Sequence, residues 1–299
     1  MKTLGSLIKR NTKMFFKDKG IFFTSLITPL ILLLLYITFL GNVYRDSVKQ
    51  IIVGTGSTVS NELINACVGG QLFSSLLAVC CVTVAFCANM LMVQDKVTGA
   101  RKDLSVSPVK DSTLALGYYV SALISTMVVA LTAVVACFIY LLVIGWYMTF
   151  ADVVLFLLDV VLLVGFGTAL SSIVNFFLSS QGQISAVGSI VSSVYGFICG
   201  AYMPISQFGS GLQAVLSFLP GTYATSLLKN HAMQGVFNEM SAQGVSELTI
   251  AEIKKMMDCN LFFFDNPVPI WAMYLILGAS VAICIAVYVA LNIKKKKGK

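Results

Sequence analysis

The sequence contains little charge for its length. Only 11% of its 299 residues are charged, whereas about 25% is usual in soluble domains. Hydrophobic residues make up 58% of the chain, and its mean hydropathy is +0.89. A water-soluble fold would lack a polar surface, so the chain is expected to form a single membrane domain.

Groups that perform catalysis are also scarce. His231 is the only histidine. No cysteine or carboxylate cluster accompanies it in the sequence, so it is predicted to be an ordinary loop histidine rather than a metal ligand or general base. The chain contains no GxxxxGK[ST] phosphate loop. The sequence therefore predicts no enzyme activity and no cofactor in this chain, and any coupling to ATP and Mg²⁺ would have to come from a partner.

Eight cysteines are present, and most of them lie inside apolar runs, where a thiol behaves as a small hydrophobic group. They predict no metal site. Cys67 and Cys259 instead fall in segments that are predicted to be loops outside the membrane. These two are expected to be free thiols, or to form a disulfide if their compartment is oxidising.

Six segments are long and apolar enough to cross a hydrocarbon core of about 30 Å at about 1.5 Å per residue. The predicted spans are residues 21–41, 72–94, 113–142, 152–178, 184–205 and 268–292. The predicted fold is therefore an all-α membrane protein with six transmembrane helices. Its parts are an N-terminal helix over residues 1–20 and a transmembrane domain over residues 21–299.

The net charge of +7 comes from lysines and arginines that cluster at the ends of the spans. Such charges mark the cytosolic flanks of a membrane protein, so nucleic acid is not an expected partner. The side that holds both termini carries fifteen of the 20 Lys and Arg residues. The other side carries Arg45, Lys49, Lys229, Lys254 and Lys255. Both termini are therefore predicted to be cytosolic, in a multi-pass protein of a cell (plasma) membrane, of bacterial type.

Residues 1–20 show an amphipathic pattern when they are wound at about 100° per residue. Leu4, Leu7, Ile8, Met14 and Phe15 fall on one side, and most basic residues fall on the other. The pattern predicts an interfacial helix on the cytosolic headgroups, with its apolar face toward the bilayer. The alternative is a basic flank without fixed structure.

The connections between the spans differ in length and charge. On the cytosolic side, residues 179–183 are short and uncharged, whereas residues 94–112 are highly charged and have room for two helical turns over 96–104. The large extracellular region, 206–267, contains an apolar stretch over 211–219 that is too short to span and is predicted to be a re-entrant or interfacial helix. Thr249 and Glu252 have capping-box spacing, which predicts a small amphipathic helix there.

Two features inside the predicted spans are candidates for a specific role. Asp159 is the one acidic residue well inside a span, so it should face protein or a water-filled cavity. It is either a substrate-pathway residue or a structural carboxylate that is hydrogen-bonded to a neighbouring helix. Small residues recur every four positions in the fifth predicted span, which predicts close helix packing. They are Gly188, Ser192, Gly196 and Gly200.

Two motifs together indicate a family. The charged loop carries an acidic residue, a glycine, a leucine and a proline, which are Asp95, Gly99, Leu104 and Pro108. The segment after the fifth predicted span carries a proline and then a Pro-x-x-Tyr motif, in Pro204, Pro220, Tyr223 and Leu228. In this order and topology the chain resembles the permeases of the ATP-binding-cassette type-2 exporter family. Lys229 stands where the family commonly has arginine.

The resemblance implies that residues 95–108 form a coupling helix seated on a separate ATPase subunit. The candidate coupling residues are Asp95, Lys96, Gly99, Arg101, Lys102, Leu104 and Pro108. It also implies a second permease subunit, either a copy of this chain or a related permease, in the same lipid bilayer. The expected function is export of a peptide, a lipid-linked molecule or a drug-like amphiphile, and a polysaccharide or an ion stays possible.

Two other functions are compatible with the composition. An ion-coupled secondary transporter would be expected to carry several intramembrane ionisable groups or broken helices in an inverted repeat, whereas Asp159 stands almost alone and no repeat is visible. A non-transporting membrane scaffold or sensor would need no charged coupling loop. The sequence favours the export permease over both.

Overall fold

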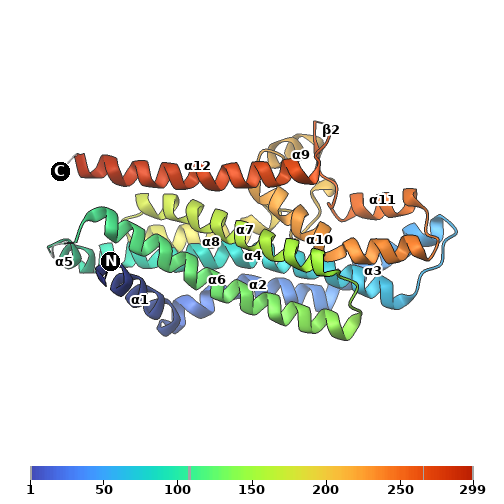
Figure 1. Ribbon diagram of the computed structural model, residues 1–299, viewed down its shortest axis with the longest axis horizontal. Helices are drawn as coiled ribbons and strands as arrows, with labels where there is room; N and C mark the ends of the chain where they lie inside the picture. The colour runs from blue at the N-terminus through green and yellow to red at the C-terminus, as the bar shows by residue number, and fades with distance from the viewer. Residues whose placement is uncertain (1, 107–108, 265, 298–299) are drawn as a thin grey trace.

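The structure is a computed structural model that describes residues 2–106, 109–264 and 266–297. It is an elongated bundle whose helices run along one long axis (Figure 1). The elements are α1 (Lys2–Lys17), α2 (Lys19–Leu35), η1 (Tyr36–Leu40), α3 (Gly41–Gly54), α4 (Asn61–Val97), α5 (Ala100–Val106), α6 (Asp111–Ile144), α7 (Phe150–Phe177), α8 (Gln181–Ile198), η2 (Ile205–Gln207), α9 (Ser210–Leu216), α10 (Pro220–Ala242), α11 (Glu247–Met256), β1 (Phe262–Phe263), β2 (Asn266–Pro267) and α12 (Ile270–Lys297).

Five helical segments within the described residues are long and apolar enough to cross a membrane: Lys19–Gly54, Asn61–Val97, Asp111–Ile144, Phe150–Phe177 and Ile270–Ile293. They correspond to five of the six predicted spans. The remaining prediction, 184–205, overlaps α8, which has 18 residues and is not among the five. Its helix ends at Ile198 because the chain turns at Gly200, whose φ of +73° suits glycine.

The bundle has two distinct ends. Both chain termini and α5 lie at one end, called here the termini end, and α3 and α11 lie toward the other, called the α11 end (Figure 1).

α1 does form a helix, so the alternative of an unstructured basic flank is wrong. Its Leu7 and Phe15 are buried, and Leu7 packs at the position of Gly117 in α6.

α4 forms the centre of the bundle and packs against α2, α6, α7, α8 and α10. Small residues allow this close packing. A Cβ added at Gly70 would lie 2.7 Å from the Cγ of Met233 in α10, and one added at Gly167 of α7 would lie 3.1 Å from the Cα of Val82. Contacts of this kind require glycine, because the neighbouring helix occupies the space of a side chain.

The first span is longer than predicted and changes its winding. α2, η1 and α3 follow one another without a break from Lys19 to Gly54, and η1 is a π-helical turn. Asp18 caps the start, where its Oδ1 accepts a hydrogen bond of 3.1 Å from the backbone N–H of Ile21. The predicted end at residue 41 was wrong, because α3 continues as a half-buried helix beyond the apolar run.

The region 206–267 differs most from the prediction. The apolar stretch 211–219 contains α9, but the following residues form α10, a 23-residue helix that was not predicted. α11 is present where an amphipathic helix was expected, but its N-cap is Ser246 rather than Thr249. A short antiparallel pair, β1 with β2, precedes α12. The region 206–267 is therefore largely helical, and α10 within it packs into the bundle.

Candidate functional site

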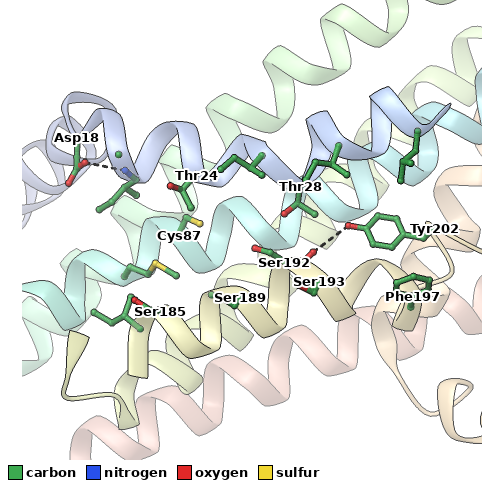
Figure 2. A pocket seen from close by; sticks show the side chains of 18 of the residues that line it. Asp18, Thr24, Thr28, Cys87, Ser185, Ser189, Ser192, Ser193, Phe197 and Tyr202 are labelled. Carbon is green, nitrogen blue, oxygen red and sulfur yellow. Dashed lines mark hydrogen bonds between the residues drawn. The ribbon is translucent and has the colours of Figure 1, made fainter. Parts of the chain in front are cut away.

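A groove with a volume of about 1020 Å³ runs along the bundle between α2 and α8. Figure 2 shows side chains from both helices pointing into it, with Cys87 of α4 at its floor. The groove extends from Asp18 near the termini end to Phe39 and Tyr202 farther along. Its walls are two helices that both pack on α4.

The lining of the groove combines hydroxyl groups with apolar side chains. Thr24 and Thr28 come from α2, and the hydroxyls of α8 are Ser185, Ser189, Ser192 and Ser193. Between them lie Ile27, Ile31, Leu35 and Phe197. Asp18 is the one charged residue among those that line the groove, and its carboxylate caps α2 at one end. The groove therefore suits an amphiphile that needs neutral hydrogen-bonding partners along an apolar surface.

The small-residue stripe of α8 is divided between this groove and the protein interior. Gly188 and Ser192 line the groove, and a Cβ on Gly188 would lie 2.8 Å from the Cε of Met90 in α4. Gly196 packs against the ring of Tyr202, whose hydroxyl donates to the carbonyl of Ser192 at 3.4 Å. Gly200 lies beyond the end of α8, so the prediction that it belongs to the span helix was wrong.

The predicted coupling loop begins in the core of the bundle. Asp95 lies in the last turns of α4 and is buried. Its two carboxylate oxygens accept hydrogen bonds from Arg10 of α1, at 2.8 and 3.1 Å, and from the hydroxyl of Tyr118 of α6, at 2.6 Å. The Asp95 carboxylate raises the pKa of the Arg10 guanidinium. This carboxylate therefore joins α4 to α1 and α6.

Lys96 also bonds within the chain. Its Nζ donates to the carbonyls of Asn175, Phe176 and Leu178, at 3.1, 2.8 and 2.8 Å. These carbonyls lie at the C-terminal end of α7, where backbone acceptors lack helical partners and a cation is favourable. Lys96 therefore joins the end of α4 to the end of α7.

The exposed part of the loop is α5. Gly99 has a φ of +85° and turns the chain between α4 and α5. Lys102 and Asp103 are exposed, whereas Arg101 and Leu104 are half-buried. Leu104 packs beside a small cluster that includes Leu7. Pro108 lies outside the described residues.

Asp159 lies in α7 and does not line the groove. Its Oδ2 is 2.6 Å from Nδ1 of His231 in α10, and its Oδ1 accepts a 2.7 Å hydrogen bond from the hydroxyl of Tyr274 in α12. The carboxylate thus connects three helices. His231 is buried and lies in α10, so the prediction of a loop histidine was wrong. Nothing in the sequence indicated that it would pack opposite Asp159.

Lys229 is fully buried in α10. Its Nζ donates to the carbonyl of Gly200 at 3.0 Å and lies 3.8 Å from Oδ2 of Asp258. The Asp258 carboxylate also accepts hydrogen bonds from the backbone N–H groups of Ile205 and Ser206. Lys229 thus fixes the turn after α8 to the turn after α11, a role the sequence left open.

The two cysteines predicted in outer loops are both buried and free. Cys67 lies inside α4, so its assignment to a loop was wrong, and its Sγ is 3.7 Å from the Sδ of Met257. Burial raises the pKa of the Cys259 thiol to about 12. No group of three or more His, Cys, Asp or Glu residues that could hold a metal occurs in the part of the chain that the structure describes.

One of two comparisons with known proteins finds a match. A search of the curated proteins finds no match for the chain. The family model for ABC-2 type transporters matches residues 2–230, from α1 into α10 and well over half of the sequence. The chain is therefore a multi-pass membrane protein with several apolar helices, and it belongs to the ABC-2 type transporter family.

Proposed function

We propose that the chain is the membrane permease subunit of an ATP-binding-cassette exporter and that its substrate leaves along the groove between α2 and α8. The observation that carries the proposal is the groove itself, an elongated space of about 1020 Å³ with hydroxyl groups on apolar walls. A peptide, a lipid-linked molecule or a drug-like amphiphile fits such a lining better than a bare ion does. Family membership supports transport and a permease role.

A second permease subunit completes the pathway in this proposal. Ile27 and Ile31 of α2 line the groove and are about half exposed, at 50% and 52%. The small residues of α8 permit close approach by another helix. Two copies of this chain, or this chain and a related permease, would enclose the substrate between their grooves.

The ATPase subunit docks at α5 on the cytosolic side. α5 is short and charged, Lys102 and Asp103 on it are exposed, and it lies at the termini end near the end of α4 (Figure 1). Movement of α5 is transmitted to the bundle through two sets of hydrogen bonds at the C-terminal end of α4. Asp95 bonds to Arg10 and Tyr118, and Lys96 bonds to the end of α7. Asp95 is thus a transmitting residue, and the contacts with the ATPase fall on exposed neighbours such as Lys102.

The orientation follows from the same arrangement. With α8 counted as a sixth crossing, both termini stay on one side of the bilayer, and the excess of Lys and Arg assigns that side to the cytosol. α1 then lies at the cytosolic boundary with its lysines toward the headgroups. The α11 end, with α3, α10 and α11, faces outward.

A pair of proline substitutions tests the coupling role of α5. Ala100 is the first residue of α5, where proline is well tolerated, whereas Asp103 is inside the helix and its N–H bonds to the carbonyl of Gly99 at 3.4 Å. Proline at an inner helical position costs about 3 kcal/mol and removes that donor. We expect Asp103→Pro to abolish ATP-dependent efflux and Ala100→Pro to retain it.

The measurement is efflux of a fluorescent amphiphilic dye from vesicles that contain the permease and its ATPase, with both variants at matched abundance. Retention of the ATPase during purification of the permease gives a second readout. Normal coupling in Asp103→Pro would show that the ATPase docks elsewhere. Dye efflux that continues without ATP and follows an ion gradient would instead support a secondary transporter.

A further inference from the structure

A second cavity adjoins the first span at its π-helical turn and the start of α3. It has a volume of about 310 Å³ and is formed by residues of η1, α3, α4 and α6. Its polar end contains Arg45 of α3, and its apolar part contains Ile37, Leu72 and Ile144. The two spaces share no lining residue, so this cavity is distinct from the proposed transport pathway.

Arg45 is held in place by neutral groups. Its Nε donates to Oδ1 of Asn65 in α4 at 2.9 Å, and its Nη1 donates to Oδ1 of Asn42 in α3 at 3.3 Å. No carboxylate of the described residues lies within ion-pair distance of this guanidinium. Two amides thus orient the side chain without neutralising its charge, and its second terminal nitrogen has no hydrogen-bond acceptor within the described chain. An oriented and unpaired guanidinium is a receptor for a phosphate or a carboxylate.

The backbone beside Arg45 has a shape that is unusual for a helix. The π-helical turn Tyr36–Leu40 continues directly into Gly41, and a Cβ at Gly41 would lie 2.8 Å from the carbonyl oxygen of Tyr36. π-helical turns occur frequently at functional sites. Tyr36 lines the cavity, is buried, and has a hydroxyl group that finds no partner within the described structure. That hydroxyl is enclosed by protein, so Arg45 is the charged group that the cavity offers to a ligand.

The rest of the lining is apolar and continuous with the lipid-facing surface. Ile37 is 73% exposed and Tyr140 of α6 is 47% exposed. Tyr140 and Trp146 lie in the last turn of α6 and just beyond it, and aromatic residues of this kind gather at the membrane–water boundary. A ligand in this cavity would thus have a charged part at the boundary and an apolar part in the hydrocarbon region.

We propose that this cavity binds an anionic phospholipid of the bilayer, with the phosphate of the lipid on Arg45 and an acyl chain along Ile37 and Leu72. Basic pockets between membrane helices on the cytoplasmic side recognise anionic lipid head groups, and a pocket in the outward leaflet can do so by the same pairing of a cation with a phosphate. The site lies at the junction of α2 and α3, whose helix also forms one wall of the α2/α8 groove. A bound lipid would therefore contact the same continuous helix that lines the groove.

The test uses the purified full chain in an uncharged detergent and measures its thermal unfolding during titration with dioctanoyl phosphatidylglycerol or dioctanoyl phosphatidylcholine. We expect saturable stabilisation by the anionic lipid and little by the zwitterionic one. Glycerol 1-phosphate, which lacks acyl chains, should stabilise the protein far less than the lipid. Equal stabilisation by both lipids would overturn the proposal, and this comparison needs no variant.

Variants then locate the site. Arg45→Gln should weaken the affinity for phosphatidylglycerol by about tenfold, which is the effect of losing one charge-assisted hydrogen bond of about 1.4 kcal/mol. Arg45→Lys, which keeps the charge but loses the planar fork, should have an intermediate affinity. Lys49→Gln is the matched control, because Lys49 is a basic residue of the same helix that does not line the cavity. Equal losses in Arg45→Gln and Lys49→Gln would show binding by surface charge alone and contradict the proposed site.

Discussion

α4 and α12 are equally apolar, but α4 lies at the centre of the bundle and α12 at its periphery. The most apolar stretch of each helix has the same mean hydropathy, 2.4, yet 89% of that stretch is buried within the protein in α4 and only 11% in α12. Hydropathy therefore tells which helices can enter a bilayer and not which of them the protein surrounds. The lipid and the protein interior are equally apolar, so other properties decide the position.

Two properties separate these helices. α4 is rich in small residues, such as Gly69, Gly70 and Ala78, which let neighbouring helices approach, and α12 presents large side chains such as Leu275 and Ile283 to its exposed face. α4 also carries buried polar groups that bond to other helices. Asn89 donates to the hydroxyls of Ser171 and Ser172 in α7. Such groups need a protein neighbour, because lipid chains offer them no partner.

The largest difference should come from adding bulk at a glycine of each helix. Gly70→Leu places a side chain where the Cγ of Met233 is only 2.7 Å from the new Cβ, whereas Gly278 of α12 has no atom within 4 Å of that position. We expect Gly70→Leu to prevent assembly of the bundle and Gly278→Leu to be tolerated. The yield of monodisperse protein in size-exclusion chromatography measures the effect.

A Gly70→Leu variant that purifies as well as Gly278→Leu would show that α4 is less tightly enclosed than the structure indicates. Equal loss of both would instead place α12 inside a larger assembly. In that case a second subunit would cover the face of α12 that is exposed in the single chain.

A smaller effect is expected from removing volume. Leu77 of α4 is fully buried and Leu275 of α12 is 63% exposed. Leu77→Ala leaves a cavity in the protein, and in a bilayer this loss of packing is the main cost, about 2 kcal/mol. Leu275→Ala exchanges one lipid-facing side chain for a smaller one and should change the free energy of unfolding by less than about 0.5 kcal/mol. Equilibrium unfolding in mixed micelles measures both, and equal values would contradict the assigned burial.

The sequence was sufficient to locate most of the apolar helices, because a run of about 20 apolar residues has few other uses. It also singled out Asp159, since a carboxylate inside a span needs a partner, and Asp95, as the acidic residue of the charged-loop motif. It could not name the partners. Arg10 lies 85 residues from Asp95, and His231 lies 72 residues from Asp159, so only the packed bundle brings each pair together.

α10 was missed for a related physical reason. It is buried on nearly all sides, between α4, α7 and α12. Several of its polar residues bond to protein groups instead of water, as Lys229 and Asn230 do, so the sequence has neither an amphipathic period nor a long apolar run. The groove between α2 and α8 could not be predicted either, because its presence depends on the distance between two packed helices and not on the residues of either helix alone.

The coupling role of residues 95–108 stays a prediction.

The smallest effect concerns the hydrogen bond that attaches α12 to the bundle. Because so little of α12 is buried, the bond from Tyr274 to Asp159, at 2.7 Å, is one of few polar contacts that fix its rotation. Interhelical hydrogen bonds in membrane proteins contribute about 0.6 kcal/mol on average and at most about 1.7. We expect Tyr274→Phe to lower the free energy of unfolding within that range. Tyr119→Phe is the control, because the Tyr119 ring packs near Tyr288 of α12 while its hydroxyl has no hydrogen bond within the described residues. A double-mutant cycle with Asp159→Asn separates the bond from other effects of each change. A coupling energy of zero would mean that the hydrogen bond does not position α12. Because little of α12 is buried within the chain, contacts with a neighbouring subunit or with lipid would then have to help hold it in place.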